Sequence, residues 1–115
     1  ICVNGPVEAD GRYRTERAEG FIALADRRGA RIVADGLGWV NECILDPSGR
    51  NLFVNETFGR RLLRFAVGPD GTLSARTSVT AFGHGTYPDG LGMDEEGGLW
   101  VVSVASNRLI RVAPD

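Results

Sequence analysis

Two segments of this sequence repeat one pattern at a spacing of 48 residues. Residues 39–54 and 87–102 each pass from an aromatic residue through a polar corner and an acidic glycine turn into an apolar run. The equivalent pairs are Asn41 and Asp89, Asp46 and Asp94, Gly49 and Gly97, and Phe53 and Trp100. A repeat of this length constrains the fold strongly, because each unit must be a module that buries its apolar faces against its neighbours.

Each unit is predicted to consist of short strands and tight turns. The 115 residues include 16 glycines and 5 prolines, and no segment keeps a helical period. Residues 43–82 contain four short apolar runs separated by turn residues. Four strands at a period of 47 to 48 residues are typical of a β-propeller blade. We therefore predict an all-β fold, a β-propeller of four-stranded antiparallel blades.

The chain contains about two and a half such blades. We place the blade remnants at residues 1–36, 37–83 and 84–115. Closed propellers have about four to eight blades, so we expect a fragment of a larger ring, or a homo-oligomer whose copies complete one. In the first remnant we expect a short strand between the corner at residues 4–6 and the turn at residues 10–11.

Composition excludes several classes of protein. The net charge is −2, with 13 basic and 15 acidic residues and no basic stripe, so we expect no nucleic-acid partner. No apolar stretch approaches the roughly 20 residues of a membrane span, so we expect no membrane association. Cys2 and Cys43 form no C-x-x-C pair, and we expect both to be small buried apolar residues. This cysteine usage favours a reducing, cytoplasmic location.

Asn41 and Asp89 are the leading candidates for chemistry. They occupy the same position in successive blades, and equivalent positions at the start of a blade converge on the axis of a propeller. Amide and carboxylate oxygens are suitable ligands for Ca²⁺ and similar divalent ions. Asn4 is a candidate for the equivalent position one blade earlier. The alternative is that Asn, Asp and Gly only build turns here, as they do in many proteins.

Other residues are interpreted structurally. His84 is the single histidine and is expected in a loop, because one histidine makes neither a histidine-based metal site nor a triad without partners. Five aromatic residues are expected in the core between blades, namely Phe21, Trp39, Phe53, Phe65 and Trp100. The arginines at residues 60, 61, 64, 108 and 111 are expected on solvated strand edges, with an anionic partner as the alternative.

Residues 36–115 resemble the senescence-marker-protein/gluconolactonase/regucalcin-like family of six-bladed propellers. The resemblance depends on the segments 36–41, 52–57, 87–91 and 98–101, and above all on Pro88-Asp89-Gly90 with an Asn one blade earlier. Residues 4–13 are similar to a further family segment, with Gly5 where that family usually has Asp.

The resemblance implies a divalent metal ion on the propeller axis, Ca²⁺ or Zn²⁺, with Asn41 and Asp89 as ligands. It implies a third ligand, a Glu, which has no match here because Glu19 lies in a different context. It also implies that Asn4 contacts substrate. The implied activity is hydrolysis of a lactone or similar ester, with Asp89 also catalytic as the acceptor of a proton from water.

Two functional hypotheses follow. One is a metal-dependent lactonase, or part of one, whose partner is a small-molecule lactone. The alternative is a non-catalytic propeller fragment that binds a divalent ion or a protein partner. An acidic third ligand beside Asn41 and Asp89 favours the enzyme, and its absence favours the alternative.

Overall fold

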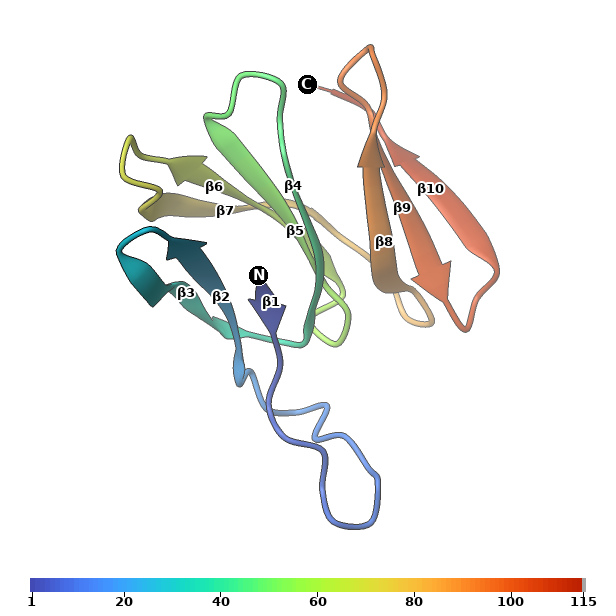
Figure 1. Cartoon of the computed structure of the whole chain (residues 1–115). Helices are drawn as coiled ribbons and strands as arrows, with labels where there is room; N and C mark the ends of the chain where they lie inside the picture. Colours follow the sequence, from blue (N-terminus) through green and yellow to red (C-terminus); the bar gives the residue numbers. More distant parts are fainter. Residues whose placement is uncertain (115) are drawn as a thin grey trace.

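The strands of this protein form three antiparallel sheets (Figure 1). The computed structural model describes residues 1–114. The first sheet contains β1 (Cys2–Val3), β2 (Gly20–Asp26) and β3 (Gly29–Leu37); the second contains β4 (Val40–Leu45), β5 (Asn51–Glu56), β6 (Arg61–Val67) and β7 (Leu73–Ala81); the third contains β8 (Tyr87–Met93), β9 (Leu99–Val104) and β10 (Arg108–Val112). Residues 1–114 contain no helix. The predicted all-β class is confirmed.

The sheets are arranged as the blades of a propeller. Each is a meander, in which every strand pairs with the next one along the chain. The strands β1, β4 and β8 begin their sheets; β1 contacts β4, and β4 contacts β8. The first strands of successive sheets therefore lie beside one another, as the inner strands of a propeller do. The predicted propeller fragment is confirmed, with a four-stranded middle sheet between two three-stranded ones.

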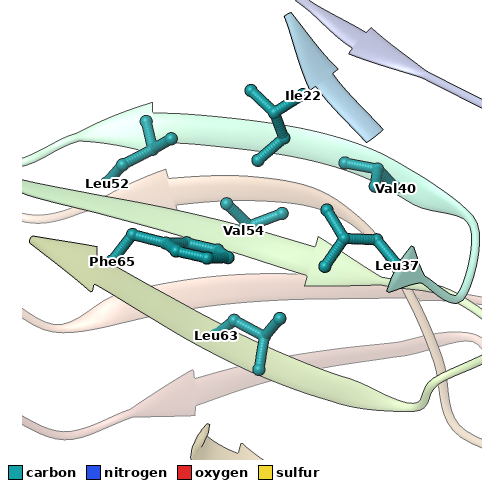
Figure 2. Close-up of a cluster of buried hydrophobic side chains, with 7 residues drawn as sticks. All are labelled: Ile22, Leu37, Val40, Leu52, Val54, Leu63 and Phe65. Carbon is teal, nitrogen blue, oxygen red and sulfur yellow. The ribbon is translucent and has the colours of Figure 1, made fainter. Parts of the chain in front are cut away.

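Apolar clusters fill both interfaces of the middle sheet. The first cluster joins the first and second sheets and contains Ile22, Leu37, Val40, Leu52, Val54, Leu63 and Phe65 (Figure 2). The second joins the second and third sheets around Leu62, Leu99 and Val101. Leu62 and Leu63 are neighbours on β6 but belong to different clusters, because successive side chains of a strand point to opposite faces. The middle sheet is therefore buried on both faces.

The third sheet keeps an open apolar face. Along β9, Trp100, Val102 and Val104 are 37%, 46% and 39% exposed and alternate with buried residues. The expectation of a core position for Trp100 is wrong. Its indole N–H instead donates to Asp94 (2.9 Å), and the guanidinium of Arg111 lies 6.0 Å from the ring centroid. No sheet within residues 1–114 covers this face.

The segment between β1 and β2 contains no strand. The short strand expected before the turn at residues 10–11 is therefore wrong. Local interactions hold this segment: the Glu8 N–H donates to the Arg12 carbonyl (2.9 Å), and Arg14 pairs with Glu8. Pro6 has no backbone N–H to donate to a strand ladder. The charged side chains of this segment pair with one another and do not pack into an apolar core.

Asp46 and Asp94 each organise a hairpin turn at equivalent positions of the repeat. Asp46 accepts hydrogen bonds from the Asn51 side chain (2.8 Å) and from nearby backbone N–H groups. Asp94 accepts from Arg111 Nε (2.7 Å) and from the Gly98 N–H (2.7 Å). The Asn51 amide is the main cause that lowers the pKa of Asp46 to about 2, and Arg111 is the main cause that lowers the pKa of Asp94 to about 2.

These pKa values predict acid sensitivity. In the unfolded chain both carboxyls regain an ordinary pKa of about 3.9, so the unfolded state binds protons more readily between about pH 4 and 2. The free energy of unfolding should therefore fall as the pH drops through this window. Asp94→Asn should flatten that fall in urea melts, whereas Asp35→Asn, on the exposed end of β3, should not. An Asp94→Asn profile parallel to that of the parent would contradict this account.

A buried carboxylate ties the first sheet to the second. Glu56 is 0% exposed, and its Oε1 accepts a hydrogen bond from the Gly38 N–H (2.7 Å). Its carboxylate also pairs with the guanidiniums of Arg61 and Arg76. Arg76 donates further to the carbonyls of Asp35 and Gly36, at 3.2 Å each. Glu56 thus connects β5, β6 and β7 with the end of β3.

We predict that Glu56→Gln weakens this connection. The neutral amide loses the charge-assisted bonds to two arginines, which should lower the free energy of unfolding by about 2 kcal/mol. The matched control is Glu95→Gln in an exposed turn, with an expected change within about 0.5 kcal/mol. Equal denaturation midpoints for the two variants would show that the buried carboxylate contributes nothing.

Candidate active site

The candidate residues Asn41 and Asp89 lie at β-bulges. The pairing of β4 with β5 passes from Val40 to Cys43 with one extra residue on β4, and that of β8 with β9 does the same from Pro88 to Leu91. Both residues therefore lie inside strands, not in turns before them as the sequence suggested. A bulge redirects side chains and leaves backbone groups without ladder partners.

Each bulge is held by a side chain from the preceding sheet. Asn4 Nδ2 donates to the carbonyl of Val40 (2.8 Å), which begins β4. The Thr57 hydroxyl donates to the carbonyl of Pro88 (2.7 Å), the equivalent position in β8. Thr57 Oγ1 also lies 3.5 Å from Asn41 Nδ2. Asn4 thus follows the inner strand of the first sheet, and Asn41 and Asp89 lie on the inner strands of the next two.

Asn55 fixes the bulge that carries Asp89. This side chain is 0% exposed, and its Nδ2 donates to the carbonyls of Asp89 (3.0 Å) and Gly90 (3.2 Å). Its Oδ1 is buried and has no hydrogen-bond partner in the described part of the chain, and the same is true of Oδ1 of Asn4. Sequence reasoning did not assign a role to Asn55. The available signal was a polar run, residues 55–57, directly after the apolar run of β5.

The side-chain oxygens of Asp89 and Asn41 have no protein partner among residues 1–114. The turn aspartates differ, because Asp26, Asp46 and Asp94 each accept hydrogen bonds from backbone N–H groups or arginines. Asp89 is half-buried and Asn41 is exposed. A carboxylate and an amide oxygen held at equivalent bulges are therefore free to bind a ligand.

These two oxygens suit a hard divalent cation but do not make a full ligand set. In the described part of the chain, no group of three or more His, Cys, Asp and Glu residues could hold a metal ion. Glu19, the glutamate that the sequence left without a match, pairs with Arg17 (3.2 Å). The donor chemistry fits Ca²⁺ or a similar ion, and a further acidic ligand is missing from residues 1–114.

A hollow of about 430 Å³ opens beside this site. Thr57, which contacts Asn41 and Pro88, is part of its wall. Trp39, expected in the core, instead packs against Phe58 and Tyr13, with ring centroids 5.5 Å and 4.5 Å away. The left-handed φ of Trp39, 62°, turns the chain into β4.

Backbone contacts explain the tight turn before β4. The Trp39 carbonyl accepts the Thr57 N–H (2.9 Å), and the Gly38 carbonyl accepts the N–H groups of Phe58 and Gly59. A Cβ on Gly38 would lie 2.9 Å from the Gly59 nitrogen. Only glycine allows this approach, which joins the loop after β5 to the start of β4.

The histidine and the two cysteines of the sequence lie outside the candidate site. His84 lies exposed in the loop between β7 and β8, with Nδ1 2.9 Å from Arg60 Nη1. Cys2 and Cys43 are free, half-buried cysteines that pack against the first apolar cluster. Within residues 1–114, no helix is long and apolar enough to cross a membrane.

Comparison with known proteins agrees with this architecture. A family model described as the SMP-30/gluconolactonase/LRE-like region matches residues 7–115. Among solved structures, 44 chains match. One is a luciferin-regenerating enzyme, with a TM-score of 0.76 and 20% sequence identity, where the match covers 84% of this chain and 33% of that one. This chain thus spans about a third of the length of that enzyme. No curated protein matches.

We predict that Asn55→Asp destabilises the interface between the second and third sheets. A carboxylate oxygen would then face the carbonyls of Asp89 and Gly90 with no proton to donate, at a cost of about 2 kcal/mol. Asn107→Asp, in the exposed turn after β9, is the matched control and should change little. Guanidinium unfolding followed by tryptophan fluorescence measures both, and equal midpoints would contradict the assigned role of Asn55.

Proposed function

This chain belongs to the SMP-30/gluconolactonase/LRE-like family, and from that premise we propose that it is, or forms part of, a metal-dependent lactone hydrolase. The observation that supports the proposal is the pair of equivalent bulges. They present Asn41 and Asp89 with side-chain oxygens that have no hydrogen-bond partner within residues 1–114. Asn4 directly follows β1, the inner strand of the neighbouring sheet, and its amide donates to the carbonyl of Val40, next to Asn41.

Asn41 and Asp89 would hold the metal ion, Ca²⁺ or Zn²⁺, together with at least one acidic ligand from outside residues 1–114. When bound, such an ion would polarise a lactone carbonyl and lower the pKa of water. A further blade of a longer parent protein, or a second copy of this chain, would be the source of the missing ligand.

The protein residues have separate proposed roles. Asp89 would accept the proton of the attacking water, because its carboxylate is half-buried and free of competing donors. Asn55 would keep the backbone of Asp89 in position through the two carbonyl contacts. Asn4, whose amide donates to the Val40 carbonyl (2.8 Å), would contact the substrate, as the family resemblance implies.

The alternative proposal is a non-catalytic propeller fragment that binds a divalent ion or a protein partner. It is favoured by the incomplete acidic ligand set of residues 1–114 and by the open apolar face of β9. It differs from the enzyme proposal in one measurable respect: metal binding would occur without turnover.

Turnover of a lactone panel, which includes sugar lactones and lactones with an apolar ring, tests the enzyme proposal. We expect hydrolysis by this chain to require added Ca²⁺ or Zn²⁺ and to stop with a chelator. Asp89→Ala should lower kcat/KM by at least about 100-fold, because it removes both a ligand and the proton acceptor. Asp35→Ala, on an exposed strand end, should leave the rate unchanged. Full turnover by Asp89→Ala would refute the assignment, and metal binding without any turnover would favour the alternative.

A further inference from the structure

The hollow beside Asn41 has an apolar wall. The lining includes Phe58, Tyr87, Val104 and Ala105. They come from the loop after β5, the start of β8, the end of β9 and the turn that follows β9. Phe58 is held in place by Trp39, whose ring centroid is 5.5 Å away. A sugar-like ligand would lose hydrogen bonds to water against such a wall without regaining them, whereas an apolar ring would gain from burial.

One cation faces the same hollow. Arg60 is part of its lining, and its guanidinium pairs with no carboxylate among residues 1–114. Its Nη1 contacts His84 Nδ1 (2.9 Å), which leaves the other guanidinium donors available. No acidic side chain within the described residues lines this hollow. A guanidinium fork of this kind matches the two oxygens of a carboxylate.

Three of the five non-glycine residues with a left-handed φ in residues 1–114 lie at or next to this rim. Trp39, Arg60 and Ala105 adopt left-handed φ values of 62°, 48° and 63°. Non-glycine residues in this region are uncommon and concentrate at ligand sites, where the surrounding structure holds them. In this protein, two of the three line the hollow and the third supports Phe58.

We propose that this hollow binds a ligand with an apolar ring and a carboxylate, so that the lactone or ester accepted here carries both groups rather than a polyol chain. The ring lies against Phe58 and Tyr87, and the carboxylate pairs with Arg60. The reactive carbonyl then lies on the side of Thr57, whose hydroxyl is 3.5 Å from Asn41 Nδ2 and donates to the Pro88 carbonyl next to Asp89. The catalytic part of this inference rests on the proposed function, whereas the binding part does not.

Three probes test the binding part without any turnover. 2-Naphthoate has the ring and the carboxylate, gluconate has the carboxylate on a polyol, and 2-naphthalenemethanol has the ring without the charge. Calorimetric titration into this chain should give at least about tenfold tighter binding of 2-naphthoate than of either other probe. Equal or tighter binding of gluconate would overturn the inference.

Two variants locate the site. Arg60→Gln should weaken 2-naphthoate binding about tenfold and leave 2-naphthalenemethanol unchanged, whereas Phe58→Leu should weaken both. Arg27→Gln, in the exposed turn between β2 and β3, is the matched control and should change neither; circular dichroism checks that each variant is folded. Unchanged 2-naphthoate binding in Arg60→Gln would overturn the assignment. If 2-naphthoate binds as expected and no lactone is hydrolysed, the proposed function and the catalytic part of this inference fail, and the binding part stands.

Discussion

The arrangement of the candidate site depends on hydrogen bonds that cross from one sheet to the bulge of the next. Each bulge takes backbone carbonyls out of its own ladder, and a buried carbonyl without a donor is costly. Asn4 donates to the carbonyl of Val40 at the first bulge. At the equivalent bulge of the next sheet, Thr57 donates to the Pro88 carbonyl and Asn55 donates to the carbonyls of Asp89 and Gly90. The same hydrogen bonds therefore hold the sheets together and fix the geometry of the site. A change that separates the sheets also releases Asn41 and Asp89.

The middle sheet is the one sheet of residues 1–114 that has a neighbouring sheet on each face. Apolar clusters cover both of its faces, and the buried carboxylate of Glu56 connects it to the turn before β4. The third sheet has a neighbour on one face only. Along β9 it presents Val102 and Val104, whereas the second sheet has Asn55 on β5 and Thr57 directly after it. In the second sheet, polar side chains at these positions hydrogen-bond to the bulge of the next sheet. In the third sheet, valines at the same positions form an exposed apolar surface.

Much of the fold could be predicted from the repeat, because strand length, turn residues and spacing are local properties. The equivalence of Asn41 and Asp89 followed from the same spacing. The bulges could not be predicted, since both repeats contain the extra residue and a comparison between them hides it. The role of Asn55 depends on contacts across a sheet interface, which no local pattern encodes. Trp100 was misassigned because the core prediction assumed that every blade face is covered.

The central claim is that Asn41 and Asp89 together bind a divalent cation, and nuclear magnetic resonance of the ¹⁵N-labelled chain tests it most directly. Titration with Ca²⁺ and then Zn²⁺ should shift the side-chain amide of Asn41 and the backbone amides of Asp89 and Gly90 together, with one common affinity. Shifts confined to the hairpin turns of Asp46 and Asp94, or no shifts at all, would contradict the account.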